Sequence, residues 1–131
     1  MTIELWLLAG AVLLGFVHVG AQSFSFKAQV GNAYTTGPRD ANLRPEQMAG
    51  RLERALRNYL ETFPLLAAAV LIVQTSGSNG RLSLTGSCLY LVARALYLPA
   101  YAFAIPYART VLWQLASIGI VLVVAQVFFP R

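Results

Sequence analysis

Long apolar stretches alternate with shorter polar ones along the chain, and four of the apolar stretches are candidates for membrane-spanning helices. Residues 3–21 form an almost unbroken apolar run. A helix rises 1.5 Å per residue, so a run of this length covers the roughly 30 Å of a bilayer's hydrocarbon core. Later runs predict spans at about 52–75, 82–104 and 107–129. The pattern predicts an all-α membrane protein: a four-transmembrane-helix bundle forming a single domain over residues 1–131.

The segments between these spans carry turn signals. The polar stretch 22–50 contains "GNAYTTGPRD", whose Gly, Pro, Asn and Asp residues favour turns, so it is predicted to be a connecting loop. The second span is short in apolar residues, and its helix is expected to begin near Pro45 with Glu46 in the first turn. "TSGSNGR" predicts a tight turn, and Pro106 separates the last two spans.

Composition supports lipid as the surrounding solvent. The mean hydropathy is +0.60 and only 11% of residues are charged, far below the roughly 25% of soluble domains. A net charge of +5 does not indicate nucleic acid, because such binding needs a basic face on a soluble body. The single Cys88 excludes an intrachain disulfide and a cysteine cluster for zinc, and is expected to be a buried structural thiol.

Basic residues gather on one side of the predicted spans. Two basic residues, Arg81 and Arg131, fall on the opposite side. The positive-inside rule therefore predicts an integral multi-pass protein with both termini outside the cytoplasm. The basic side holds Lys27, Arg39, Arg44, Arg51, Arg54, Arg57 and Arg109.

The N-terminal end of the second span carries the stretch "RLERALRNYLETFP". Four of its polar residues fall at i, i+3, i+4 and i+7, so one helical stripe holds Arg54, Arg57, Asn58 and Glu61. Charges at membrane depth cost about 2.5 to 3.5 kcal/mol each and persist where they face a cavity. Paired arginines suit carboxylates, and Glu61 suits an ammonium group, so the stripe predicts a pocket for a zwitterionic, net-anionic molecule. Alternatively, these residues pair with one another and seat the helix at the interface.

A second polar stripe runs along the third span. It holds a central arginine among three tyrosines, spaced at i, i+4, i+7 and i+11: Tyr90, Arg94, Tyr97 and Tyr101. Arg94 needs a partner, and Glu61 is the expected one. Pro99 removes one backbone hydrogen bond and could open this face by a local bend. Tyr90 alone is better explained as an interfacial anchor.

Arg109 and Thr110 begin the fourth span. A cation near a thiol lowers its pKa from about 8.5, so Arg109 could stabilise a thiolate, with the Thr110 hydroxyl as a further donor. The alternative role of Arg109 is a positive-inside anchor. His18 is expected to be a packed helix residue outside the site.

Two stretches resemble the MAPEG family, the membrane-associated proteins of eicosanoid and glutathione metabolism. "RALRNYLETFP" is similar to the family's second-helix signature, and "ARALYLPAYAFAIPYARTVLW" looks like its third-to-fourth-helix region. The likeness covers essentially the whole chain and is nearest to the bacterial branch. It implies a homotrimer in a bacterial inner membrane, with glutathione as co-substrate bound between subunits near the cytoplasmic face.

The resemblance also implies roles for single residues. Glutathione would contact the second-span residues Arg54, Arg57, Asn58 and Glu61. Arg94 and Tyr101 would line the site with Tyr97, which stands where some family enzymes carry histidine. Arg109 would sit by the sulfur with Thr110 beside it, and Trp113 stands where an aromatic hydroxyl can occur.

Three functions follow from the motif and the resemblance. The first is a glutathione-dependent transferase or peroxidase, needing no metal, that attacks hydrophobic small-molecule electrophiles entering from the bilayer. The second is a non-catalytic membrane protein of the same fold that binds glutathione or lipid; the family also contains a binding protein without transferase activity. The third is a structural trimer whose charges pair internally.

Overall fold

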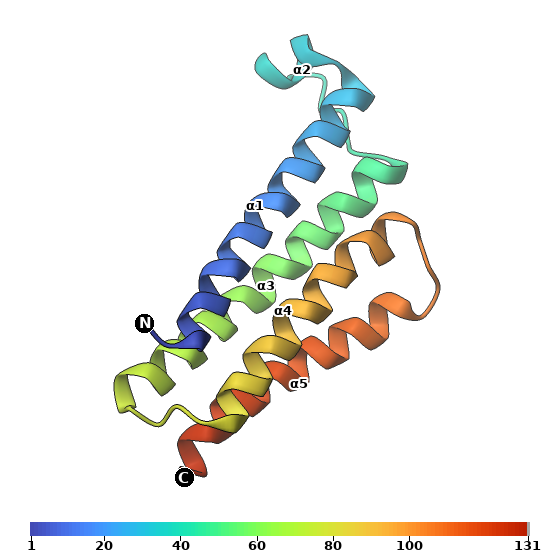
Figure 1. Cartoon of the computed structure of the whole chain (residues 1–131). Helices are drawn as coiled ribbons and strands as arrows, with labels where there is room; N and C mark the ends of the chain where they lie inside the picture. The colour runs from blue at the N-terminus through green and yellow to red at the C-terminus, as the bar shows by residue number, and fades with distance from the viewer. Residues whose placement is uncertain (131) are drawn as a thin grey trace.

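In the computed structural model, which describes residues 1–130, the chain is an antiparallel bundle of long helices (Figure 1). Within these residues there are five helices: α1 (Ile3–Val30), α2 (Asn32–Thr36), α3 (Gln47–Ser76), α4 (Arg81–Ala102) and α5 (Ala108–Phe128). All of the described helices except α2 are long and apolar enough to cross a membrane, as predicted. The two ends of the chain lie at one end of the bundle, and α2 lies at the other.

Helix α1 corrects the predicted loop after residue 21. It continues to Val30, nine residues beyond the apolar run, and reaches about 42 Å. The added segment "QSFSFKAQV" is polar but holds no Gly or Pro, so nothing in it breaks a helix. The helix ends where Gly31 takes φ +93° and its N–H caps the carbonyl of Lys27. The apolar run ends at residue 21, whereas the helix itself continues to Val30.

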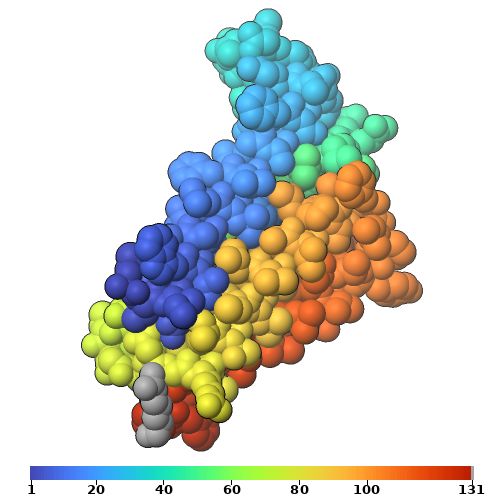
Figure 2. All heavy atoms as spheres, in the orientation of Figure 1, coloured from blue at the N-terminus to red at the C-terminus, as the bar shows by residue number. Residues whose placement is uncertain are grey.

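The rest of this connection is ordered by polar side chains. The Tyr34 hydroxyl accepts from Leu43 N at 2.7 Å and donates to the Arg39 carbonyl at 3.3 Å. Gln29 binds the backbone on both sides of Pro45, at Arg44 O and Glu46 N. The extension of α1 and the connection form a knob that projects past the other helices (Figure 2).

Helix α3 begins at Gln47, close to the predicted start near Pro45. It ends at Ser76, where Gly77 adopts φ +66° and the Ser78 N–H returns to the carbonyl of Val73. The predicted "TSGSNGR" turn is therefore confirmed. Pro99 does not interrupt α4, which runs unbroken to Ala102.

Glycines set the closest helix contact. A Cβ added at Gly86 of α4 would lie 2.3 Å from the Gly119 carbonyl of α5, and one at Gly119 would lie 2.6 Å from the Gly86 carbonyl. The other side of the core joins α1 to α3, where the Tyr59 hydroxyl donates to the carbonyl of Ala11. These contacts fix the helices around which the site is built.

Candidate functional site

A hollow of about 300 Å³ opens between α3, α4 and α5 at the end of the bundle that carries α2. Its lining comprises Arg54, Asn58, Tyr97, Tyr101, Arg109, Thr110 and Trp113. Six of these are among the nine site residues predicted from sequence. The structure thus brings together, from separate helices, two residues of each polar stripe and the start of α5.

Tyr101 is the centre of this group. Its hydroxyl accepts from Arg54 Nε at 3.1 Å, and the guanidinium carbons of Arg54 and Arg109 lie 5.9 and 5.0 Å from its ring centroid. The Tyr97 ring packs beside it at 5.6 Å between centroids. Two cations with donors in excess of acceptors therefore border one cavity, which suits an anionic ligand.

The connection between α4 and α5 positions Arg109. Ala104 and Tyr107 take the left-handed values φ 53° and 64°, which reverse the chain within a few residues. Arg51 holds this turn, because its Nε donates to the carbonyl of Ala102 at 2.9 Å. Arg51 also lines an adjoining hollow of about 450 Å³ that shares Arg109 with the first. Arg51 lies one helical turn before Arg54 on the same helix, and this spacing in the sequence could have assigned it to the site.

Arg94 lies beneath the hollow and is fully buried, with 0% exposure. The expected pairing with Glu61 is wrong: the Nη1 of Arg94 donates to Asn58 Oδ1 at 2.8 Å. Its guanidinium also lies over the Tyr97 ring at 4.2 Å and the Tyr59 ring at 5.3 Å. Aromatic faces and an amide replace the carboxylate, because the helix turns Glu61 outward.

Arg57 and Glu61 do not join the hollow in this chain. Both are exposed on the outer face of α3, and Arg57 lies 3.8 Å from Glu53 in a helical i, i+4 pair. The alternative that the four stripe residues pair with one another describes neither arginine: Arg57 pairs with Glu53, outside the stripe, and Arg54 bonds Tyr101. The stripe splits because its two edges face different surroundings: one faces α4 and α5, the other faces away from the bundle.

The structure tests three further predictions, for Tyr90, Cys88 and His18. Tyr90 is fully buried and shares a 2.9 Å hydrogen bond with Thr62, so the anchor interpretation is wrong. Cys88 is exposed on α4, so the expectation of a buried thiol is also wrong. His18 is a packed helix residue, as expected: its Nδ1 bonds the Leu14 carbonyl at 3.0 Å and its ring stacks on Tyr59 at 4.5 Å.

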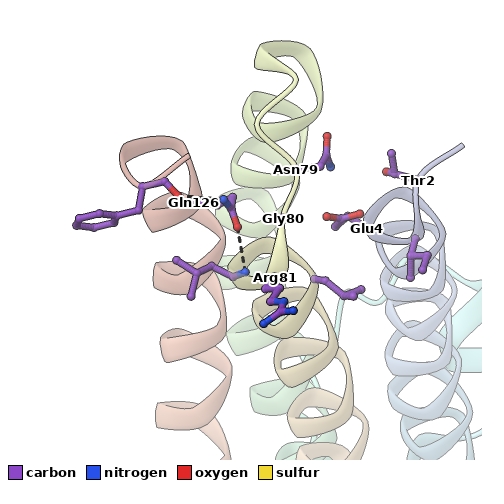
Figure 3. Close-up of a pocket in the computed structure, with 10 residues that line it drawn as sticks. Thr2, Glu4, Asn79, Gly80, Arg81 and Gln126 are labelled. Carbon is purple, nitrogen blue, oxygen red and sulfur yellow. Dashed lines mark hydrogen bonds between the residues drawn. The ribbon is translucent and has the colours of Figure 1, made fainter. Parts of the chain in front are cut away.

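A second cavity, of about 740 Å³, lies at the opposite end of the bundle and was not predicted. Figure 3 shows Glu4 from α1 and Gln126 from α5 reaching toward Gly80 at the start of α4. Gln126 Oε1 accepts from Leu82 N at 2.9 Å, while the Ser83 hydroxyl donates to Glu4 Oε1 at 2.6 Å. Both side chains are thus already hydrogen-bonded to the start of α4. The lining also places the Glu4 carboxylate in the same cavity as Arg81, the one cation among its described lining residues, so the cavity is a poorer candidate for an anion site than the hollow.

Comparison with known proteins agrees with the resemblance seen in the sequence. Searches of curated proteins and of solved structures gave no match. The family model for the MAPEG family matches residues 3–129, almost the whole chain. With the helices long enough to span a bilayer, this match identifies an integral multi-pass membrane protein. The chain belongs to the MAPEG family.

Proposed function

We propose that the protein is a membrane-bound glutathione-dependent transferase or peroxidase acting on lipophilic electrophiles. The observation that carries this proposal is the arrangement around Tyr101, where Arg54 and Arg109 border one hollow from different helices. Glutathione carries two carboxylates, an ammonium group and a thiol. Paired guanidiniums suit its carboxylates, and family membership makes it the first ligand to test.

The arrangement supports a thiolate mechanism. Arg109 and the N-terminus of α5 both favour negative charge beside Thr110, so a sulfur held there would lose its proton to water more readily. The Tyr101 oxygen accepts from Arg54, which leaves the hydroxyl proton free to donate to the sulfur. The thiolate would then form a carbon–sulfur bond with the electrophile as the leaving group departs with the bonding electrons. Trp113, which lines the hollow, offers the electrophile an apolar surface.

Self-association completes the proposed site. Arg57 and Glu61 stand exposed on a membrane helix, where contact with lipid is costly. We propose that a homotrimer covers this face and brings both residues to glutathione at the subunit boundary. We place the protein in the inner membrane of a bacterial cell. The basic end of the bundle would face the cytoplasm, and both termini would lie on the opposite side of the membrane.

The test is stabilisation of the purified protein by glutathione in detergent. A ligand present at 100 times its dissociation constant adds about 2.7 kcal/mol of stability. We expect millimolar glutathione to raise the melting temperature, and glutathione diethyl ester, which lacks both carboxylates, to raise it far less. Equal shifts with the two ligands, or no shift with either, would exclude the proposed site.

A binding protein without turnover is the second candidate. It is favoured by Trp113, which borders the hollow without supplying a hydroxyl. Conjugation of a model aryl halide separates the two: stabilisation by glutathione with no conjugation would assign the binding function.

A further inference from the structure

Arg94 is placed to act on the ligand through another residue. It is fully buried, and the residues that line the hollow do not include it. It meets two of the lining residues: its Nη1 donates to Oδ1 of Asn58 at 2.8 Å, and its guanidinium lies over the Tyr97 ring at 4.2 Å. Of these two contacts, the one to Asn58 is a hydrogen bond. Arg94 can therefore influence what the hollow binds without touching it.

The hydrogen bond determines which way the Asn58 amide faces. An arginine side chain has only donors, so the Asn58 atom that meets it must be the oxygen. The Asn58 NH₂ group is then turned away from Arg94, on a side chain that lines the hollow. Without Arg94, the amide could rotate and present its oxygen, which would repel a carboxylate.

A stack of aromatic rings holds Arg94 in this position. Its guanidinium lies between Tyr97, at 4.2 Å, and Tyr59, at 5.3 Å. Tyr59 is itself fixed from the first helix, by its hydrogen bond to the Ala11 carbonyl and by the His18 ring stacked at 4.5 Å. The stack connects α1 to a hollow that α1 does not line.

Stability alone does not account for this buried charge. Among the described residues no carboxylate pairs with Arg94, and its Nε and Nη2 have no hydrogen-bond partner there. Burying a charge that is incompletely compensated is costly, and apolar replacements of buried ions are often neutral or stabilising. A buried charge that lowers the stability of the folded protein indicates that Arg94 serves function and not stability.

We propose that Arg94 is a positioning residue that sets the Asn58 amide so that its NH₂ group donates to a carboxylate or carbonyl oxygen of the bound peptide. This inference rests on the proposed glutathione site and assigns Arg94 a role distinct from direct ligand contact. It makes a specific claim: the contribution of Arg94 to binding passes entirely through Asn58.

A double-mutant cycle tests that claim. Glutathione dissociation constants are measured by calorimetry on the detergent-purified full chain for wild type, Asn58→Ala, Arg94→Met and the double variant. We expect each single variant to bind about tenfold more weakly, as for loss of one charge-assisted hydrogen bond. The double variant should bind no more weakly than Asn58→Ala. Losses that multiply would show that Arg94 acts on the ligand by a route other than Asn58, either directly or through the Tyr97 ring, and would overturn the proposal. An unchanged constant for Arg94→Met would overturn it as well.

Melting temperatures of the same variants separate positioning from a structural role. Arg94→Met should melt at or above the wild-type temperature while binding poorly. A loss of binding that follows a loss of stability would overturn the proposal. If Arg94→Met does not fold, Arg94→Lys replaces it in the cycle, with the same requirement that the double variant match Asn58→Ala. Ser87→Ala, which removes a buried, unpartnered hydroxyl from the same helix, is the matched control and should leave binding unchanged.

The cycle also distinguishes failure of this inference from failure of the proposed function. Wild-type protein that does not bind glutathione removes both. Wild-type protein that binds, with multiplicative losses in the cycle, removes only the role assigned to Arg94.

Discussion

The two ends of the bundle both carry polar groups in cavities, but they balance donors and acceptors differently. At the end that holds the chain termini, Glu4 is matched by Ser83, and Gln126 caps the first amides of α4. At the other end, Arg54 and Arg109 share a single tyrosine and border the same hollow. At the terminal end the carboxylate and the amide are hydrogen-bonded, and one described cation, Arg81, lines the cavity. At the other end two cations border one hollow, and none of the described carboxylates lines it.

The difference shows why cavity size is a poor guide to function in this molecule. The cavity at the terminal end is the larger, about 740 Å³ against 300 Å³. A buried polar group that already has its partner gains little from a ligand, because binding must first break the existing bond. Unmatched guanidiniums gain a charge-assisted bond outright. The comparison predicts that changes at the hollow affect ligand and chemistry, and that changes at the terminal end affect stability.

The largest expected effect is on chemistry at the hollow. Arg109→Ala removes the cation beside the proposed sulfur position and should lower kcat for aryl halide conjugation about 100-fold, as for loss of one stabilising group in an anionic transition state. Stopped-flow kinetics measures kcat, and calorimetry measures the glutathione dissociation constant. Equal losses of rate and affinity would contradict a role at the sulfur. Arg81→Ala, at the terminal end, is the control and should change neither.

A smaller effect is expected on affinity from the outer face of α3. Arg57→Ala should raise the glutathione dissociation constant about tenfold with little change in kcat, because the proposed role of Arg57 is to bind a carboxylate across a subunit boundary. Titration at several salt concentrations should show a weaker salt dependence for the variant. An unchanged constant would remove Arg57 from the site and leave it as the helical partner of Glu53.

The terminal end should respond in stability alone. Gln126→Ala removes the acceptor for Leu82 N and Ser83 N, and losing such a helix cap costs about 1 kcal/mol. For a chain of this size the melting temperature should fall by roughly 3 to 6 °C. Conjugation kinetics at a temperature where the variant is folded should match wild type. A changed KM for glutathione would mean that the two ends of the bundle are coupled and do not act separately.

The smallest effect is expected at Thr110. Thr110→Val keeps the shape of the side chain and removes one neutral hydroxyl donor, so kcat should fall only about threefold, since a neutral hydrogen bond contributes roughly 0.5 to 1.5 kcal/mol. Thr75→Val, an exposed threonine near the terminal end of α3, is the matched control. A loss as large as that of Arg109→Ala would make Thr110, and not the cation, the principal group at the sulfur.

Some features of the site followed from sequence because they depend on a single helix. The i, i+3, i+4 spacing put Arg54 and Asn58 on one stripe, and the structure places both in the hollow. The partner of Arg94 could not be predicted in the same way. Glu61 was the carboxylate expected from the pattern, but Glu61 is exposed, and Asn58, three residues earlier on α3, meets the arginine. A rotation of a fraction of a turn between α3 and α4 decides between them.

The sequence by itself determined the four spans, the end of the bundle that carries the charge and the family, because hydropathy, helical period and motif spacing are local properties of the chain. Only the tertiary structure decided which polar groups find partners within the chain and which are left to face a ligand. The reason is physical: a hydrogen bond needs two atoms within about 3 Å, and helix packing sets that distance between residues remote in sequence. Glu4 and Ser83 meet this condition at one end. At the other, the guanidinium of Arg109 shares only the face of Tyr101 with Arg54 and remains available to an anion.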